Sequence, residues 1–425
     1  MKYSDYVKPK YRPGTKEIIA EFYIEPNRVS LKEAAGSVAA ESSVGTWTDV
    51  TGIPRRIRSL RANVFSTKRA GKGAFIKISY PVELFEKGSI SQLLSSIGGN
   101  VFGMKTIKNL KLYDIHFPES YTKYFKGPAF GIKGVRHIMG IKTRSLIGTI
   151  IKPKLGLNEK EHAKKASEAW IGGLDIVKDD ENLTSMTFNK FDTRLTKTLD
   201  AQAHAENVTG EEKAYMPNVT APYDEMLRRA HAAADSGSKD IMVDIVTVGF
   251  SGLQQLTEDV HGKVVIHAHR AGHGMFTHSS KHGMSMVVLA KLARLAGVDQ
   301  IHIGTASIGK MVQEDPITPL EDEIEEQFIP KSEKDHILAQ KWYGIKPVFA
   351  VASGGLHPGM IPELIEKMGT DIIMQFGGGC HGHPEGTVAG AMAIRQALDS
   401  VREGFTLKEY AKYHSALKVA LKFFR

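Results

Sequence analysis

The feature that most constrains the fold is a regular alternation of short apolar segments and longer helical segments, beginning near residue 145. The apolar segments have the length and the β-branched content of buried strands. There are eight of them, at residues 146–152, 175–178, 214–219, 240–246, 264–268, 300–303, 348–352 and 371–376. Alternating strands and helices are typical of parallel sheets, and eight such units in about 250 residues match a closed barrel. The pattern therefore predicts an α/β protein built on a (β/α)8 TIM barrel, with an open, doubly wound sheet as the alternative.

The remaining segments divide the chain into two expected domains. Helices are expected in the barrel part at residues 159–170, 223–234, 283–295, 361–367, 387–401 and 407–424. Before the barrel, strands are expected at 17–25, 59–67, 74–80 and 110–117, and helices at 31–42 and 89–97. We therefore expect a smaller α+β domain of ferredoxin-like type at residues 1–125. The barrel and its C-terminal helices follow at residues 126–425.

Composition excludes several classes of protein. The chain of 425 residues is 42% hydrophobic and 24% charged, as is usual for soluble proteins, and has no apolar run of membrane-spanning length. Its one cysteine, Cys380, excludes an internal disulfide framework, so we expect a cytoplasmic protein. The net charge of +9 is spread along the chain rather than gathered in a tail or stripe. This distribution favours small anionic substrates, and we expect neither nucleic acid nor a membrane as a partner.

The end of the second barrel strand carries an unusual set of charges. Residues 172–182 read GGLDIVKDDEN. Because strand side chains alternate, Lys178 and Asp180 point to one face and Asp179 to the other, while the next acid, Glu181, lies just past the strand. Two converging carboxylates suit a hard cation such as Mg²⁺. A lysine ammonium repels a metal ion, so these residues alone leave an ion-paired strand end without metal as the alternative.

Polar residues recur at the carboxyl ends of other barrel strands, where TIM-barrel enzymes place their catalytic groups. They are Lys152 and Lys154 after the first strand, His267, His269 and Arg270 at the fifth, His302 and Lys310 at the sixth, Ser353, Gly354 and Gly355 at the seventh, and Gly377, Gly378 and Gly379 at the eighth. The glycine-rich loops are typical of phosphate binding, and the cations could hold a second anion. The arrangement predicts a substrate with a phosphate at each end and a metal between them, which would promote enediolate formation.

Several of these segments resemble the large chain of ribulose-1,5-bisphosphate carboxylase/oxygenase (RuBisCO). The matching segments are GTIIKPK at 148–154, GLDIVKDDE at 173–181, HAHR at 267–270 and SGG at 353–355, and in the first domain AESSVGTW at 40–47 and GNVFG at 99–103. The match runs in order along nearly the whole chain and is most similar to the archaeal type, form III. It implies an enzyme that carboxylates, and oxygenates, ribulose 1,5-bisphosphate (RuBP) with CO₂ or O₂ and produces 3-phosphoglycerate.

The resemblance also assigns catalytic roles. It implies that Lys178 reacts with activator CO₂ to form a carbamate, which binds Mg²⁺ together with Asp180 and Glu181. The other implied catalytic residues are Lys152 for proton transfer to and from the enediolate, Lys154 in support of it, His269 for hydration and cleavage, and Lys310 on the mobile sixth loop, where it steadies the added CO₂.

Substrate binding and assembly are implied in the same way. Arg270, His302 and Ser353 match one phosphate-side set. The other set comprises Thr46, Trp47, Gly355, Gly378 and Gly379, with Gly354 and Gly377 in the same loops. Glu41, Thr46, Trp47 and Asn100 correspond to residues that reach the site from a partner chain, where Glu41 and Asn100 act in catalysis. The implied protein is a homo-oligomer built from dimers with shared active sites, and it requires no small subunit.

Two alternatives stay open at this point. A RuBisCO-like enolase or isomerase would act on another sugar phosphate, and a non-catalytic assembly protein would keep only the barrel. RuBisCO-like enolases and isomerases typically differ from RuBisCO at several site residues, and a non-catalytic protein would have lost metal ligands. This chain retains both the site residues and the metal ligands. The resemblance departs at residues 311–315, which lack the Glu-Gly that usually follows the loop lysine. The sequence does not distinguish a carbon-fixing cycle from nucleotide salvage.

Overall fold

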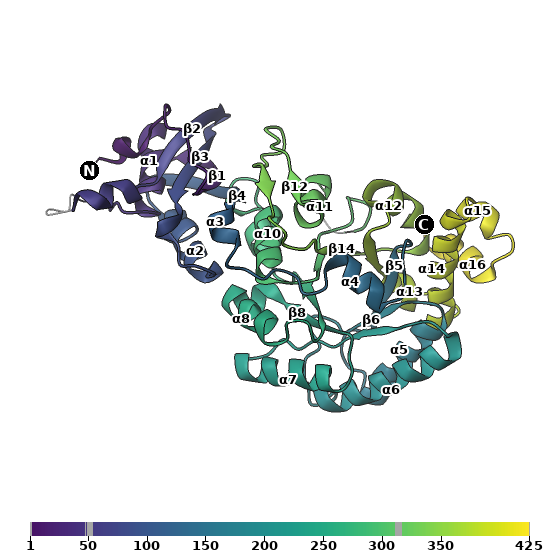
Figure 1. Cartoon of the computed structure of the whole chain (residues 1–425). Coiled ribbons are helices and arrows are strands. Elements are labelled where there is room, and N and C mark those ends of the chain that lie inside the picture. Colours follow the sequence, from purple (N-terminus) through teal and green to yellow (C-terminus); the bar gives the residue numbers. More distant parts are fainter. Residues whose placement is uncertain (1, 47, 49–53, 311–316, 425) are drawn as a thin grey trace. The chain divides into compact units, whose positions relative to one another are not determined.

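Figure 1 shows the computed structural model of the chain, which describes residues 2–46, 48, 54–310 and 317–424. The chain forms two compact units, each assembled from more than one stretch of sequence. The first contains Met1–Lys126, Gly272–Ala296 and Glu326–Ile345, and the second contains Gly127–Ala271, Gly297–Glu325 and Lys346–Arg425. The predicted domain boundary after residue 125 lies one residue before Lys126, where the first stretch of the first unit ends. The prediction assigned Gly272–Ala296 and Glu326–Ile345 to the barrel domain, whereas both belong to the first unit.

The first unit is built around a five-stranded sheet with the order β10-β4-β1-β3-β2. Its strands are β1 (Glu17–Pro26), β2 (Asn63–Ala70), β3 (Gly73–Pro81), β4 (Ile107–His116) and β10 (Gly283–Met284). The first four are antiparallel neighbours, and β10 pairs in parallel with β4. Helices α1 (Leu31–Glu41) and α2 (Ile90–Ile97) complete the predicted ferredoxin-like order. Ser30 and Ser89 cap these helices by accepting hydrogen bonds from backbone N–H groups.

Further helices and strands complete the first unit. They are the helices α3 (Glu119–Thr122), α9 (Gly274–Thr277) and α10 (Met286–Ala296), the strands β12 (Phe328–Ile329) and β13 (Gln340–Lys341), and 3-10 helices at Tyr3–Tyr6, Arg55–Leu60, Val82–Leu84 and Asn100–Gly103. Two predictions need correction here. The strand expected at 59–67 begins only at Asn63, because a 3-10 helix precedes it, and the helix expected from residue 283 begins at Met286, because Gly283–Met284 forms β10.

The second unit is a barrel of parallel strands, as the alternation predicts. The strands are β5 (Leu146–Ile150), β6 (Ile176–Lys178), β7 (Ala214–Met216), β8 (Asp240–Asp244), β9 (Val265–His269), β11 (Gln300–His302), β14 (Phe349–Ser353) and β15 (Ile372–Gln375). Each pairs in parallel with its neighbours in the order β7-β6-β5-β15-β14-β11-β9-β8. The ring closes between β7 and β8, where Asn218 bridges to Met242. A closed barrel is therefore present, and the open doubly wound sheet is excluded.

Helices follow most of the barrel strands, and the barrel core is apolar. The helices are α4 (Gly131–Ile138), α5 (Glu159–Ile171), α6 (Phe191–Thr209), α7 (Tyr223–Asp235), α8 (Ile245–Asp259), α11 (Ile317–Glu325), α12 (Ile361–Met368), α13 (Gly378–His381), α14 (Thr387–Arg402), α15 (Leu407–Tyr410) and α16 (Ser415–Phe423), with a 3-10 helix at Pro358–Met360. Buried side chains from several strands, such as Met242 and Phe349, pack with Ile132 and Val135 of α4. Among the described residues, no helix combines the length and the apolar content needed to cross a membrane.

Three features of the barrel part differ from the predictions. Helix α6 was not predicted, because its buried face carries Arg194, Thr198 and Gln202 and so lacks the apolar period of an ordinary surface helix. The strand expected at 240–246 ends at Asp244, where α8 begins directly. The helix expected at 407–424 is two helices, α15 and α16, separated by residues 411–414.

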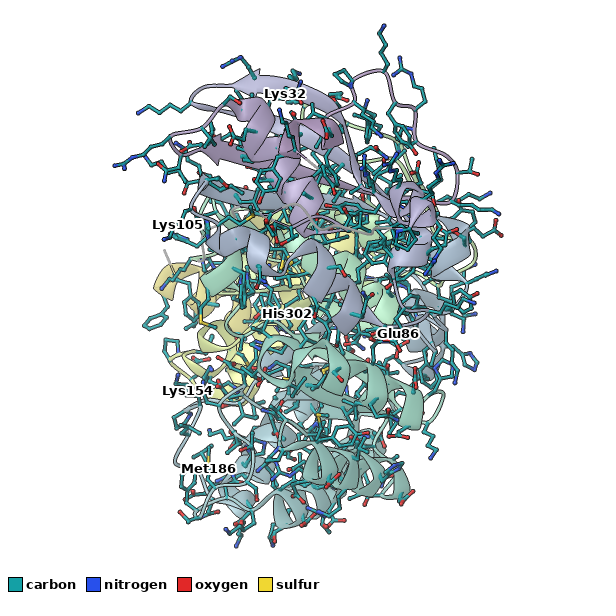
Figure 2. All side chains as sticks on the ribbon, turned by 90° about the vertical axis from the view of Figure 1, so that its left-hand side faces the viewer. Lys32, Glu86, Lys105, Lys154, Met186 and His302 are labelled. Carbon is teal, nitrogen blue, oxygen red and sulfur yellow. The ribbon has the colours of Figure 1, made fainter. Side chains whose placement is uncertain are left out.

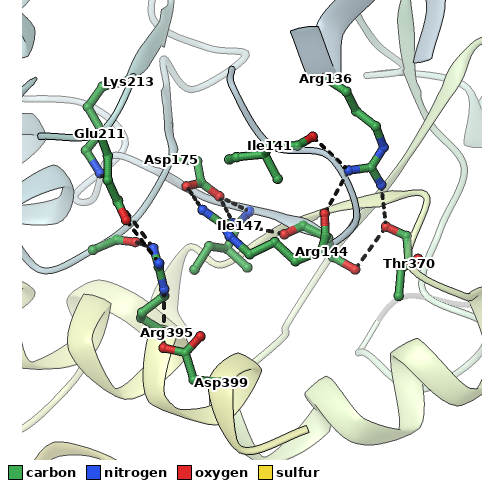
Figure 3. A network of polar contacts seen from close by, with 12 residues as sticks. Arg136, Ile141, Arg144, Ile147, Asp175, Glu211, Lys213, Thr370, Arg395 and Asp399 are labelled. Carbon is green, nitrogen blue, oxygen red and sulfur yellow. Dashed lines mark hydrogen bonds and ion pairs between the residues drawn. The ribbon is translucent and has the colours of Figure 1, made fainter. Parts of the chain in front are cut away.

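Ion pairs tie together the amino ends of the barrel strands, as Figure 3 shows. Two nitrogens of Arg144 each donate to an oxygen of Asp175 at 2.6 Å, and Asp175 also accepts from the backbone N–H of Ile147 at 2.9 Å. Arg136 reaches the carbonyl oxygen of Thr370 at 2.9 Å. A cavity of about 420 Å³ adjoins this network, with Lys142 among its lining residues. Because its arginines and carboxylates largely bond one another, this end of the barrel serves stability, as is usual in TIM barrels.

Candidate active site

Lys178 is the last residue of β6 and is fully buried. Its Nζ lies 2.8 Å from the carbonyl oxygen of Asp179 and 2.9 Å from the sulfur of Met242. Burial lowers the pKa of the Lys178 ammonium, and the nearby carboxylates of Glu181 and Asp244 only partly oppose this effect. The amine is therefore shifted towards its neutral, nucleophilic form.

Asp180 lies on the same face as Lys178, as the strand period predicts. Its buried carboxylate accepts hydrogen bonds from Lys152 Nζ at 2.5 Å and from Asn182 Nδ2 at 3.0 Å. Burial opposes ionisation of Asp180, but these hydrogen bonds outweigh burial and lower the pKa of the carboxyl group. Glu181 is partly exposed beside it. The ends of β5 and β6 thus place two carboxylates and two lysines together.

Asp179 points to the opposite side of the strand, into a buried polar network. It accepts hydrogen bonds from Tyr215 Oη at 2.8 Å and from Arg194 Nε and the backbone N–H of Asn218 at 3.1 and 2.9 Å. His162 Nε2 lies 3.1 Å away. Arg194 and His162 outweigh the effect of burial and lower the pKa of Asp179. The network anchors the strand end that carries Lys178 and Asp180. It was not predicted, because its members lie far apart in the sequence.

We expect the polar network around Asp179 to contribute strongly to the stability of the barrel. Arg194→Met should lower the free energy of unfolding by about 3–5 kcal/mol, because it leaves the buried Asp179 carboxylate without its guanidinium. Urea denaturation monitored by circular dichroism measures this loss. Arg228→Met is the matched control, since Arg228 pairs with Asp192 and Glu225 on the exposed surface and should change stability by no more than about 0.5 kcal/mol. Equal losses in the two variants would show that this network has no special weight.

His269 occupies the end of β9 between two carboxylates. Its Nδ1 lies 3.0 Å from Asp244 Oδ1, and its Nε2 lies 3.7 Å from Glu181 Oε2. Burial and the charge of Lys178 lower the pKa of His269, and Asp244 only partly restores it, so the ring is held in its neutral form. Asp244 was not among the predicted site residues. A carboxylate within the apolar run at 241–246 is the signal that could have identified it.

The glycines of the sixth and seventh loops permit close contact between those loops. The backbone N–H of Lys310 donates to the carbonyl oxygen of Gly354 at 3.0 Å. A Cβ at Gly309 would lie 2.1 Å from that oxygen, and Gly355 has a φ of +74° and lies against the Lys310 side chain. Residues 311–316, which include the predicted departure from the family, lie outside the described residues. The described end of the loop therefore places Lys310 beside the seventh strand.

The eighth strand leads into helix α13. Gly378 and Gly379 are its first residues, and the first N–H groups of a helix have no partner within the helix. A Cβ at Gly379 would lie 2.1 Å from the carbonyl oxygen of Leu356, so glycine is required for the eighth loop to pack on the seventh. A Cβ at Gly377 would lie 3.1 Å from Lys152 Cε, which places this loop beside the first strand.

The remaining predicted residues lie in different surroundings. Arg270 and Ser353 are partly buried and His302 is buried at their strand ends, while Lys154 is exposed on the loop after β5, and Figure 2 labels it with His302. Glu41, Thr46 and Asn100 belong to the first unit, where Glu41 ends α1 and Asn100 begins a 3-10 helix. Trp47 lies outside the described residues.

Comparisons with known proteins match both parts of the chain. Residues 5–121 match the family model for the ribulose bisphosphate carboxylase large chain, N-terminal domain, and residues 131–424 match that for its catalytic domain. The ribulose bisphosphate carboxylase of Pyrococcus abyssi is 49% identical over 423 residues, covering 99% of this chain and 96% of the relative. That of Methanocaldococcus jannaschii is 47% identical over 428 residues, covering 99% and 100%.

Solved structures agree with these sequence matches. A dimeric archaeal Rubisco from Hyperthermus butylicus has a TM-score of 0.95 and 47% identity, with 99% of each chain covered. An octameric Rubisco from Pyrococcus horikoshii has a TM-score of 0.91 and 47% identity, covering 99% of this chain and 96% of that one. The predicted resemblance and enzyme class are confirmed, and the chain belongs to the ribulose bisphosphate carboxylase large-chain family.

Proposed function

We propose that this chain catalyses the Mg²⁺-dependent carboxylation of RuBP to 3-phosphoglycerate, with oxygenation by O₂ as a competing reaction. The observation that carries the proposal is the buried Lys178 amine at the same strand end as Asp180 and Glu181. The relatives of this chain from Pyrococcus and Methanocaldococcus are named ribulose bisphosphate carboxylase, which supports the same substrate. The direct test is whether the purified chain incorporates labelled CO₂ when supplied with RuBP but not with another sugar phosphate.

Lys178 supplies the activating group in this proposal. Its neutral amine attacks the carbon of CO₂, a new N–C bond forms, and one proton leaves the nitrogen, which gives a carbamate with a single negative charge. The change converts a buried base into an oxygen donor beside two carboxylates. Burial favours the neutral amine that the reaction requires.

The donor set fits Mg²⁺ once Lys178 is modified. Among the described residues, no three His, Cys, Asp or Glu side chains gather closely enough to hold a metal ion. Asp180 and Glu181 supply two carboxylates, and a carbamate on Lys178 would supply the third oxygen donor, which suits a hard cation. When bound, the metal would stabilise negative charge on the substrate oxygens during enediolate formation.

Proton transfer falls to side chains around this cluster. Lys152 donates to Asp180 at 2.5 Å, so its ammonium stands at the rim where a substrate carbon would exchange its proton. His269 is held neutral and is oriented by Asp244, as a general base requires. Lys154, on the same loop as Lys152, would support it by adding positive charge near the substrate.

Phosphate groups would bind at two places on the barrel rim. The N–H groups of Gly378 and Gly379 at the start of α13 suit one phosphate, with Gly355, Gly354 and Gly377 in the adjoining loops. Arg270, His302 and Ser353 suit the other, because they supply a guanidinium, an imidazole and a hydroxyl at the ends of β9, β11 and β14. Thr46 and Trp47 would complete the first site from a partner chain.

We further propose a homo-oligomer built from dimers with shared active sites. The solved relatives described as dimeric and octameric support this assembly. Mixing inactive Glu41→Gln and Lys178→Ala chains under exchange conditions should restore part of the activity, because one of the two sites in each hybrid dimer is then wild type. Carboxylation measured before and after exchange provides the test. Confirmed exchange without any recovery would contradict shared sites.

A further inference from the structure

A continuous chain of buried hydrogen bonds leads from the amino end of β8 through the barrel interior to His302. Asp240 Oδ1 accepts from Gln300 Nε2 at 3.0 Å, and Gln300 Oε1 lies 2.8 Å from His267 Nδ1. His267 Nε2 lies 2.8 Å from His302 Nε2. All four side chains are buried, with exposed fractions of 5% or less. The bond to His267 uses Nε2 of His302, so Nδ1 is the ring nitrogen that remains for a ligand.

The direction of this chain decides what His302 offers to a ligand. A neutral imidazole has one donor and one acceptor nitrogen. The tautomer of His267 therefore determines the tautomer of His302. With an ionised Asp240, Gln300 donates to it, His267 donates from Nδ1, and His302 donates from Nε2. The Nδ1 of His302 then carries a lone pair, which a phosphate oxygen cannot use.

Protonation of Asp240 gives it an O–H donor, which allows every bond in this series to reverse. The carboxylic acid donates to the Gln300 carbonyl oxygen once the amide has turned over, and the amide N–H donates to Nδ1 of His267. His267 then donates from Nε2 to Nε2 of His302, which moves the His302 proton to Nδ1. In this state His302 is neutral and presents an N–H group, which a phosphate oxygen can accept.

We propose that a proton held on Asp240 sets His302 as a hydrogen-bond donor to the substrate phosphate, acting through Gln300 and His267. This inference rests on the proposed function, in which His302 contacts one phosphate of RuBP. Asp240, Gln300 and His267 are then positioning residues, since none of them touches the substrate.

The charges around the two ends of the chain favour a proton on Asp240 rather than a second proton on His302. Burial, together with His269, His267, Lys178 and Arg270, holds the pKa of His302 well below its usual range. Asp240 faces Asp299, Lys239 and the amide of Gln300.

Burial and the Asp299 carboxylate raise the pKa of Asp240 to about 8, and Gln300 and Lys239 offset this only in part. The donor state of His302 is therefore present below about pH 8 and is lost as the pH rises through that value.

Calorimetric binding of RuBP to the full-length enzyme, without Mg²⁺ or added CO₂, tests the proposal free of turnover. The wild-type dissociation constant should rise about tenfold between pH 7 and pH 9, because the protonated fraction of Asp240 falls about tenfold. Asp240→Asn should abolish this rise, since an amide does not titrate between pH 7 and pH 9. Gln300→Leu interrupts the chain and should bind weakly with the same loss of pH dependence.

Ser238→Ala is the matched control, because Ser238 is buried and bonds the backbone oxygen of Asp240 but no side chain of the relay. It should keep the wild-type pH dependence. A wild-type slope in Asp240→Asn would overturn the proposal.

If Asp240→Asn does not fold, the wild-type enzyme provides a second test of the proposal. Calorimetric titrations with RuBP at pH 8, in buffers of different ionisation enthalpy, should show uptake of about half a proton per RuBP bound. Zero uptake would overturn it. Absence of RuBP binding at pH 7 would instead contradict the proposed function, and this inference with it.

Discussion

Lys178→Ala should reduce RuBP carboxylation to background, a loss of at least roughly a thousandfold, because it removes the group proposed to become the carbamate ligand. Preincubating the wild-type enzyme with CO₂ and Mg²⁺ should raise its initial rate, and the variant should show no such activation. Because only the neutral amine reacts, activation of the wild type should become faster as the pH rises. Initial rates of labelled CO₂ incorporation measure all three effects.

Lys213→Met is the matched control for this variant. Lys213 is as buried as Lys178, but it lies at the amino end of β7, where its Nζ pairs with Glu211 at 2.8 Å. Its replacement should lower stability and leave the turnover of the folded enzyme unchanged. A wild-type enzyme that is fully active without CO₂ preincubation or divalent metal would contradict the role of Lys178.

Lys310→Ala should separate proton abstraction from carboxylation. The groups proposed for enediolate formation lie at the ends of β5 and β6, so exchange of the substrate C3 proton with solvent should persist. Carboxylation should fall by at least roughly a hundredfold, because the new carboxylate loses an ammonium worth about 3–4 kcal/mol in the transition state. Parallel assays of proton exchange and CO₂ incorporation measure the two steps.

The structure supports this separation. The backbone N–H of Lys310 donates to the carbonyl oxygen of Gly354 and its side chain lies against Gly355, so this exposed lysine is held beside the end of the seventh strand. Lys142→Ala, an exposed lysine at the amino end of the barrel, is the control and should affect neither step. If the two steps fell together in Lys310→Ala, or neither changed, the lysine would not have this role.

Most of the barrel could be predicted because its strands are short apolar runs with little ambiguity of length. Each of the eight expected strands is present with its ends shifted by a few residues at most. The alternation of side chains was also sufficient to separate Asp180, which faces Lys152, from Asp179, which faces Arg194. In these cases a local period determines the structure directly.

Other features depend on contacts that no local pattern reveals. Helix α6 buries Arg194 and Gln202 where a surface helix would bury leucine, so its period was hidden. Asp244 and the relay from Asp240 to His302 join residues from different strands, and their roles follow only from burial and distance. The recruitment of Gly272–Ala296 to the first unit likewise reflects packing and the pairing of β10 with β4.

The measurement that tests the account most directly is the fate of labelled CO₂ in the presence of the purified chain, Mg²⁺ and RuBP. We expect acid-stable label in 3-phosphoglycerate, with one labelled carboxyl group and two molecules of 3-phosphoglycerate for each RuBP consumed when O₂ is excluded. Consumption of RuBP, or exchange of its C3 proton, without any label in 3-phosphoglycerate would contradict it and would identify an enolase or isomerase of the same fold.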